Sequence, residues 1–125
     1  MRNPVASTPA RILVVDDDEA VRDAVCDVVT MLGHTAEPAS DAYEALDRFR
    51  PGRYDLVVTD LAMPVMNGLD LARHLRTLEP TLPITIFSAT ALPPEPALEV
   101  IGITVACKPD VDALVRLIQR TLEKS

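Results

Sequence analysis

Aromatic residues are scarce in this sequence of 125 residues, which has no tryptophan and only two phenylalanines and two tyrosines. The core must therefore be built from Val, Leu, Ile and Ala. Proteins that bind single-stranded nucleic acid stack the bases on aromatic side chains, and this sequence has few to offer. Its net charge of −7 would also be repelled by a phosphate backbone. We therefore expect no nucleic-acid binding through this domain.

Cysteines and long apolar runs are also few. Cys26 and Cys107 lie far apart and outside any metal-ligand spacing, so we interpret them as reduced packing thiols in the cytoplasm. No segment approaches the roughly 20 apolar residues that a membrane helix needs, and the first ten residues do not resemble a secretory signal. The length suits one domain. We expect a flexible leader over residues 1–10 and a single domain over residues 11–125.

Short apolar runs alternate with amphipathic stretches from Arg11 onward. Gly33 is a helix stop signal, and Asp41 with Glu44 forms a capping-box pattern. Pro38 places its strand at a sheet edge. Alternation of this kind predicts an α/β protein with a mainly parallel sheet covered on both faces. The expected strands are 12–15, 34–39, 56–59, 84–88 and 103–107, and the expected helices are 21–32, 41 to about 50, a helix after Gly68 with a Leu71, Leu75 and Leu78 stripe, and 111–122.

The segment 92–101 does not fit the pattern of a regular helix. Pro93, Pro94 and Pro96 each remove a backbone donor and clash with a preceding helical turn. We expect at most a short or irregular fourth helix after Pro96.

Polar residues follow the predicted strands, where ligands bind in sheets of this type. The first strand ends in residues 16–19 (DDDE), the third in Asp60, the fourth in Ser88 and the fifth in Lys108. Each has an ordinary explanation by itself, since acids favour helix starts and Asp forms turns. The combination is much less expected by chance.

Several carboxylates in one small site repel each other, so they need a cation. Mg²⁺ takes oxygen ligands from carboxylates, water and phosphate, and the Lys108 ammonium would add a second positive charge. A carboxylate held in this way can act as a nucleophile toward a phosphoryl group, because phosphoryl transfer depends mainly on positioning and charge neutralisation.

Most of the chain, from residue 11 to about residue 124, resembles the receiver domains of response regulators. The resemblance rests on the runs ILVVDDDEAVR, DLVVTDLAMPVMNGLDLARHLR, PITIFSAT and CKP, of which DLVVTDLAMPVMNG is the most specific. It implies a flavodoxin-like, doubly wound, five-stranded parallel sheet of order 2-1-3-4-5. It also implies a phosphoacceptor in a two-component phosphorelay that takes a phosphoryl group from a histidine kinase or phosphotransfer protein in a Mg²⁺-dependent reaction and signals by a conformational change. Such a domain is not an enzyme, apart from weak hydrolysis of its own phosphoryl group.

The resemblance also implies a role for each matching residue. Asp60 is the expected phosphoacceptor, Asp17 a direct Mg²⁺ ligand, and Asp16 a ligand that acts largely through water. The backbone carbonyl of Ala62 would complete the metal site. The Ser88 hydroxyl would move toward the phosphoryl group, and Lys108 would pair with a phosphoryl oxygen. Met63, Pro64 and Gly68 match the loop after the acceptor, and the Lys108–Pro109 bond is expected to be cis.

Three departures from the family concern the output switch. Val105 stands where the family often has Tyr or Phe, and a valine cannot swing as an aromatic ring does. The stretch from Ser88 to Lys108 is short and proline-rich, and Asp110 replaces an apolar residue. We therefore hypothesise that signalling through the fourth-helix face is altered, and that partner contact uses another surface such as the first helix.

Rival interpretations remain open on the sequence alone. The run 16–18 also fits the D-x-D signature of haloacid-dehalogenase-type phosphatases, although the chain is short for that fold and has no cap segment. A degenerate receiver used only for docking would not need the intact acid set, hydroxyl and lysine. A flavin-binding domain would need a hydroxyl-rich phosphate loop where this sequence has acids. The cognate kinase, output target, phosphate lifetime and oligomeric state cannot be inferred from these residues.

Overall fold

A computed structural model describes residues 9–89 and 102–123 of the chain. Its five strands are all parallel and lie in the order β2-β1-β3-β4-β5, so the predicted flavodoxin-like topology is confirmed. The predicted fourth helix falls within residues 90–101, outside the described residues. The strands are β1 (Arg11–Val15), β2 (Thr35–Ala39), β3 (Leu56–Thr59), β4 (Ile84–Ser88) and β5 (Ile103–Cys107), and the helices are α1 (Glu19–Met31), α2 (Ala42–Arg48), α3 (Gly68–Leu78) and α5 (Val111–Glu123).

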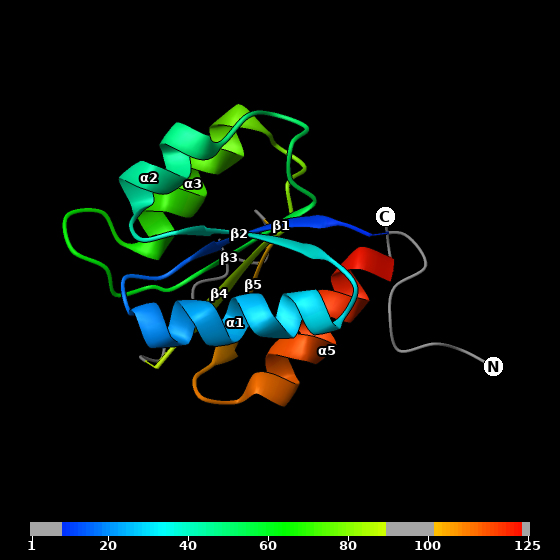
Figure 1. Cartoon of the computed structure of the whole chain (residues 1–125). Coiled ribbons are helices and arrows are strands. Elements are labelled where there is room, and N and C mark those ends of the chain that lie inside the picture. The colour runs from blue at the N-terminus through cyan, green and yellow to red at the C-terminus, as the bar shows by residue number, and fades with distance from the viewer. Residues whose placement is uncertain (1–8, 90–101, 124–125) are drawn as a thin grey trace.

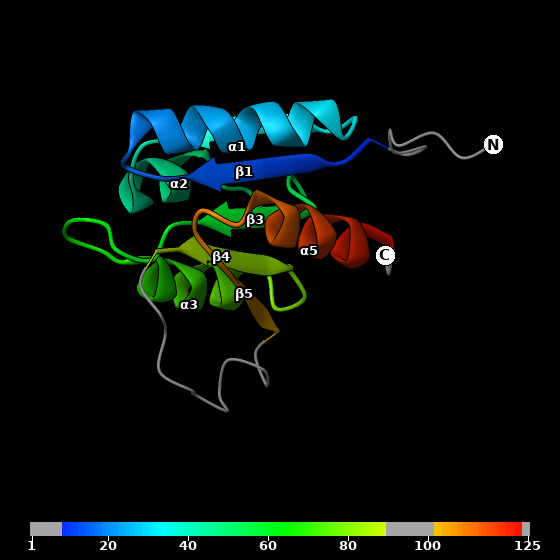
Figure 2. The ribbon, with the colours of Figure 1, turned by 90° about the horizontal axis from the view of Figure 1, so that it is seen from below.

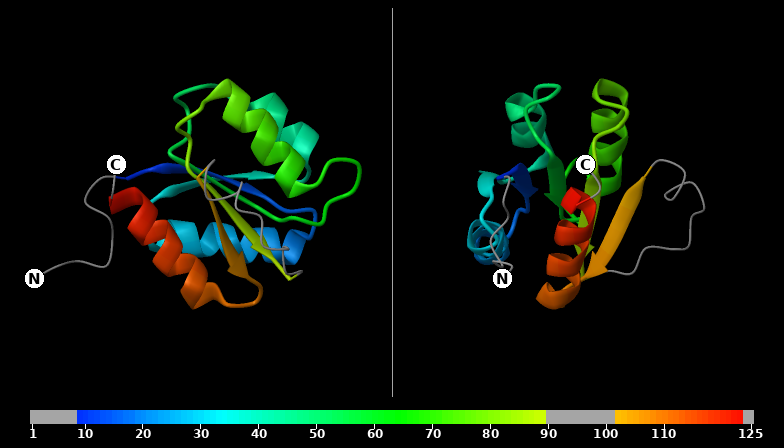
Figure 3. Two further views of the ribbon diagram at one scale, coloured as in Figure 1. Left: turned by 180° about the vertical axis from the view of Figure 1, so that it is seen from behind. Right: turned by 90° about the vertical axis from the view of Figure 1, so that its right-hand side faces the viewer.

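Helices cover both faces of the sheet, with α2 and α3 on one side and α1 and α5 on the other (Figure 1). Side chains alternate between the two faces of a strand, so each apolar strand feeds two cores. In β1, Leu13 and Val15 join the core under α2 and α3, whereas Ile12 and Val14 join the core under α1 and α5. Figure 3 shows the same two layers from behind and from the side. The continuous apolar runs of the sequence are explained by this double burial.

Helix starts follow the cap signals of the sequence. The Asp18 carboxylate accepts from the N–H groups of Ala20 and Val21 and caps α1. At α2, Asp41 accepts from the Glu44 N–H at 2.7 Å, and the Glu44 side chain accepts from the Ser40 N–H at 2.9 Å. This reciprocal pair confirms the predicted capping box, except that the Glu44 side chain accepts from the N–H of Ser40 and not from that of Asp41 itself.

Element boundaries agree with the sequence predictions to within about two residues. Strand β2 lies at the sheet edge, as Pro38 predicted, but starts at Thr35 instead of His34. Helix α2 ends at Arg48, two residues before the predicted end. The Leu71–Leu75 stripe of α3 is buried as predicted, whereas Leu78 is half exposed because α3 ends there.

The strands run in one direction, so their carboxyl ends gather at one end of the molecule. Figure 2 shows the arrowheads of β1, β3 and β4 pointing to the end where α1 begins. Ala10, the last residue of the predicted leader, is buried and its carbonyl accepts from the Thr35 N–H. Residues 1–8 lie outside the described part, and for them the leader stays a prediction. None of the helices in residues 9–89 and 102–123 combines the length and the apolar character that a membrane span requires.

Candidate functional site

Two neighbouring central strands place the first pair of carboxylates. Strands β1 and β3 are paired in register up to Val15 and Thr59, so the next residues, Asp16 and Asp60, emerge together. The Asp60 N–H donates to the Val15 carbonyl at 2.9 Å, which extends the ladder by one hydrogen bond. Both side chains are buried, with residue exposures of 4% for Asp16 and 8% for Asp60.

Asp17 completes a cluster of three acids. One carboxylate oxygen from each of Asp16, Asp17 and Asp60 lies within 4.8 Å of the others. Asp17 is exposed, so the cluster opens to solvent on its side. The donors are oxygen only and anionic, which fits a hard divalent cation such as Mg²⁺ and does not fit metals that prefer nitrogen or sulfur.

Lys108 follows β5, an edge strand of the sheet, and brings a positive charge to the same cluster. Its Nζ lies 2.8 Å from Asp16 Oδ2 and 3.2 Å from Asp60 Oδ1. Its backbone N–H donates to the Ser88 carbonyl at 2.9 Å, so the ends of β4 and β5 are joined. The Lys108–Pro109 peptide bond is cis, as the family resemblance implies.

The excess of negative charge is visible in the acid–base properties of the site. Burial raises the pKa of Asp60, and the charge of Asp16 raises it further, while Lys108 and the Leu61 N–H offset this only in part. Burial alone would lower the pKa of Lys108, but its contacts with Asp16 and Asp60 outweigh burial and raise it. Ionised Asp60 is therefore under-compensated, and a bound cation would relieve it.

The chain after Asp60 is held very close to it. The Leu61 N–H donates to Asp60 Oδ1 at 2.9 Å, and the Gly68 N–H donates to the Leu61 carbonyl at 2.8 Å. A Cβ atom at Gly68 would lie 2.0 Å from the Asp60 carbonyl oxygen, which no real side chain allows. Only glycine permits α3 to begin against the backbone of Asp60.

Asp16, Asp17, Asp60 and Lys108, all predicted from the sequence, are brought together. Ser88 is buried at the end of β4, beside this group in the sheet order, and Ala62 lies exposed two residues after Asp60. The roles assigned to these residues stay predictions.

Sequence reasoning missed two contributors to the geometry. Arg22 Nη1 donates to the Asp16 carbonyl at 2.9 Å and so fixes the turn between β1 and α1. No pattern in the sequence indicated this contact. The close approach of Gly68 to Asp60 was also missed, although an isolated glycine at a predicted helix start was a usable signal.

Comparisons with known proteins agree with this geometry. A family model described as the response regulator receiver domain matches residues 12–101. The response regulator MprA of a Mycobacterium species (strain KMS) is 44% identical over 81 residues, covering 65% of this chain and 35% of MprA. The chain thus spans about a third of the length of the curated relatives it matches.

Two solved structures cover nearly the whole chain. The non-phosphorylated HemR receiver domain of Leptospira biflexa is 31% identical, covers 91% of this chain and 94% of that one, and has a TM-score of 0.82. The response regulator TrrA of Thermotoga maritima, in complex with Mg²⁺ and BeF, is 27% identical, covers 90% and 98%, and has a TM-score of 0.80. With the sheet order, the acid cluster and the family model in agreement, this chain belongs to the family of response regulator receiver domains.

Proposed function

We propose that this domain accepts a phosphoryl group on Asp60 from the phosphohistidine of a histidine kinase or phosphotransfer protein. The observation that carries the proposal is the convergence of Asp60 with two further acids and the Lys108 amine at the carboxyl end of the sheet. Two solved structures add support: TrrA is seen with Mg²⁺ and BeF, and also in complex with the histidine kinase ThkA.

In the transfer, a carboxylate oxygen of Asp60 forms a bond to phosphorus while the bond between phosphorus and the donor imidazole nitrogen breaks. The donor ring, protonated on its other nitrogen, leaves as neutral histidine, and Asp60 becomes an acyl phosphate. Asp17, Asp60 and the Ala62 carbonyl would hold Mg²⁺ directly and Asp16 largely through water, and the bound ion would neutralise charge on the phosphoryl oxygens. Lys108 would donate to a phosphoryl oxygen, and the Ser88 hydroxyl would donate to another.

This domain is a phosphoacceptor and not a catalyst that turns over external substrates, apart from slow hydrolysis of its own acyl phosphate. A haloacid-dehalogenase-type phosphatase, with Asp16 as nucleophile, is disfavoured because Asp16 Oδ2 is occupied by Lys108 and Oδ1 by the Asp18 N–H. The two free thiols, Cys26 and Cys107, favour a reducing compartment such as the cytoplasm.

Labelling by a small phosphodonor tests the proposal without knowledge of the kinase. Purified protein is incubated with acetyl phosphate, with and without Mg²⁺, and its mass is measured. We expect one phosphoryl group per chain with Mg²⁺ and none without it. Asp60→Asn should abolish labelling, whereas Asp47→Asn, a matched change at an exposed acid of α2, should leave it intact.

Labelling that persists in Asp60→Asn would rule out Asp60 as the acceptor. No labelling of the parent chain, together with no response to Mg²⁺ and beryllofluoride, would favour a degenerate receiver that only docks. Turnover of a small phosphate ester over many cycles would favour the phosphatase interpretation.

We also propose that the output switch is altered. Val105, in the position of the family aromatic residue, is 39% exposed on β5 and is paired in register with Ile86. Comparison of amide spectra with and without beryllofluoride, repeated with a partner, tests this. Large shifts concentrated at residues 92–106, with partner binding there, would contradict it.

A further inference from the structure

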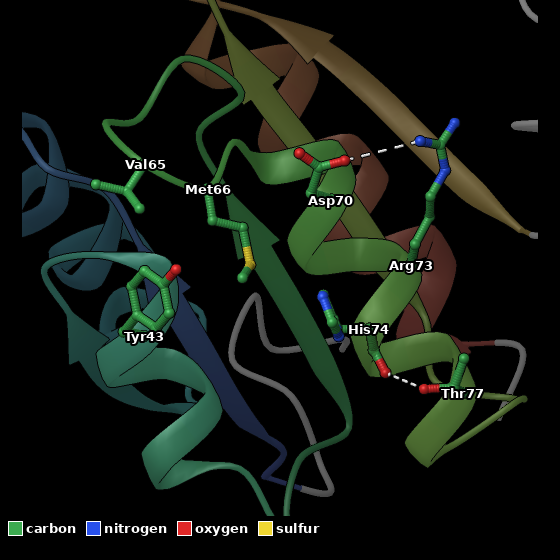
Figure 4. Close-up of a pocket in the computed structure, with 7 residues that line it drawn as sticks. All are labelled: Tyr43, Val65, Met66, Asp70, Arg73, His74 and Thr77. Carbon is green, nitrogen blue, oxygen red and sulfur yellow. Dashed lines mark hydrogen bonds and ion pairs between the residues drawn. The ribbon is translucent and has the colours of Figure 1, made fainter.

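A second hollow lies apart from the acidic site, between α2 and α3 (Figure 4). It has a volume of about 390 Å³. Tyr43 of α2 and Val65 and Met66 of the loop after β3 form an apolar side, and α3 supplies a polar side that includes Asp70 and His74. Figure 4 shows the Tyr43 ring and the Met66 side chain facing the same gap from different elements.

Val65 is held in a conformation that its side chain disfavours. Its φ is +72°, in the left-handed region, and the Met66 N–H donates to the Pro64 carbonyl at 2.8 Å to close a three-residue γ-turn around it. This form of the γ-turn is rare and strained, and a β-branched residue is a poor occupant of it. Glycine would adopt the same turn without the strain.

The Val65 side chain gains little from packing within the domain. The residue is 88% exposed, so its side chain buries little apolar surface in this fold. Strained backbone conformations cluster at functional sites. We therefore look for the role of the Val65 side chain in a contact outside the domain.

Exposed apolar side chains converge on the same hollow. In residues 9–89 and 102–123, six large apolar residues are exposed, and two of them, Tyr43 (55%) and Val65, border it. Met66 is half buried, packs against the core and joins the two. An apolar cluster with a polar rim is typical of a protein-binding surface, and Tyr and Met are enriched in such surfaces.

The charges around the hollow select the partner. Arg73 also lines the hollow and lies 3.8 Å from the Asp70 carboxylate, which is still 51% exposed and can accept a second cation. The loop of residues 61–67 projects at the end where α1 begins, as Figures 1 and 2 both show, and there Asp17, Asp18 and Glu19 are exposed. These carboxylates belong to a chain whose net charge is −7, so a cationic partner would be attracted to it overall.

We propose that the α2–α3 groove, bordered by Tyr43, Val65 and Met66, binds a short segment of a partner protein that presents a bulky apolar side chain beside a lysine or arginine. The apolar side chain enters between Tyr43 and Met66, against Val65. The neighbouring cation pairs with Asp70. This surface does not depend on phosphorylation of Asp60.

Three matched peptides test the proposal with the isotope-labelled chain in its unphosphorylated state. The probe is acetyl-Ser-Arg-Leu-Phe-Arg-Ser-amide. In one control Glu replaces each Arg, and in the other Ser replaces Leu and Phe. For the probe we expect amide shifts concentrated at Tyr43, Val65, Met66 and His74, with a Kd on the order of 10⁻⁴ M. Both controls should bind at least tenfold more weakly, and added salt should raise the Kd of the probe.

Single substitutions separate a binding role from a structural one. Tyr43→Ala and Val65→Gly should each raise the Kd of the probe about fivefold or more. Val65→Gly should also raise Tm by about 2–4 °C, because it removes backbone strain. Met31→Ala, at an equally exposed apolar position of α1, should change neither quantity.

Several results would overturn the proposal. One is equal binding of the arginine and glutamate peptides, and another is shifts confined to α1 or α5. A lower Tm in Val65→Gly with unchanged affinity would show that Val65 serves the fold alone. Concentration-dependent shifts at the same residues without peptide would identify a second copy of this chain as the occupant.

Discussion

The two ends of the sheet differ in how completely their polar groups are paired. At the amino end the polar groups are matched one to one: the Ala10 N–H donates to His34 Nδ1 at 2.9 Å, and the Arg11 N–H donates to Asp55 Oδ2 at 2.9 Å. The Asp55 N–H returns a hydrogen bond to the Arg11 carbonyl at 2.8 Å. At the carboxyl end three carboxylates gather, and two of them, those of Asp16 and Asp60, contact the amine of Lys108.

The difference indicates that the fold trades stability for reactivity at the carboxyl end of the sheet. Paired polar groups at the amino end satisfy the backbone as the strands begin. Unequal charge at the carboxyl end should destabilise the domain until a cation binds. The following changes either exaggerate this contrast or remove it.

Gly68→Ala should have the largest effect. Its Cβ would meet the Asp60 carbonyl oxygen at 2.0 Å, so either α3 or Asp60 must move. We expect a loss of about 2 kcal/mol in unfolding free energy and a roughly 100-fold slower phosphorylation of the protein that remains folded. Urea unfolding and acetyl phosphate labelling measure the two effects.

A suitable control is Gly52→Ala, in an open turn with φ of +80°. It should also destabilise the protein, because alanine disfavours that φ, but it should leave the labelling rate unchanged. Equal slowing in both variants would mean that general destabilisation, and not displacement of Asp60, controls the rate.

Asp55→Ala tests the amino end. It leaves the Arg11 N–H without its acceptor, and we expect a loss of about 1 kcal/mol in unfolding free energy with normal phosphorylation. Asp55→Asn keeps an acceptor oxygen and should lose less. A strong effect of either change on labelling would remove the functional contrast between the two ends.

Asp60→Asn should stabilise the protein at pH 7 without Mg²⁺, by a few degrees in Tm. Burial and Asp16 raise the pKa of Asp60 in the folded state. The stability that a raised carboxyl pKa confers is therefore present below the unfolded pKa of about 4 and is lost as pH rises through the folded pKa. A neutral amide avoids that loss.

The gain from Asp60→Asn should shrink as pH falls toward 4, and Mg²⁺ should raise the Tm of the parent chain more than that of the variant. Thermal scans across pH measure both. A variant less stable than the parent at neutral pH would mean that the carboxylate is fully compensated by Lys108.

The smallest effect is expected from pH acting on His34. Burial lowers its pKa more than Asp55 raises it. Because the unfolded state then takes up a proton first, stability is full above the unfolded pKa of about 6.5 and is lost as pH falls below it. His34→Asn, which keeps an acceptor for the Ala10 N–H, should flatten the decline in Tm between pH 7 and pH 5.

Local patterns predicted most of the fold. Buried parallel strands appear as apolar runs, and the acids that follow Val15 and Thr59 indicated the site because parallel strands end at one edge. In α1, Val25 is buried and Val21 and Leu32 pack against the core as predicted, but Val29 and not Val28 is fully buried. Periodicity gives the face of a helix but not which neighbour covers it.

What the sequence could not reveal depends on how loops approach the sheet. The contact of Arg22 with the Asp16 carbonyl, the φ of Val65 and the closeness of Gly68 to Asp60 all arise from tertiary geometry. The convergence of Lys108 with the acids was predicted although Lys108 and Asp16 are 92 positions apart, because both residues follow parallel strands.

Pro38 affects whether a strand from another molecule can pair with the edge of the sheet. The Thr35 N–H and the Ala39 carbonyl both bond toward β1, so by alternation Pro38 directs its backbone nitrogen away from the sheet. The outer margin of β2 therefore lacks a donor where a foreign strand would need one. With the Glu37 carboxylate bridged to Arg11 and Arg53 beside it, this margin is a poor template for the addition of a strand from another molecule.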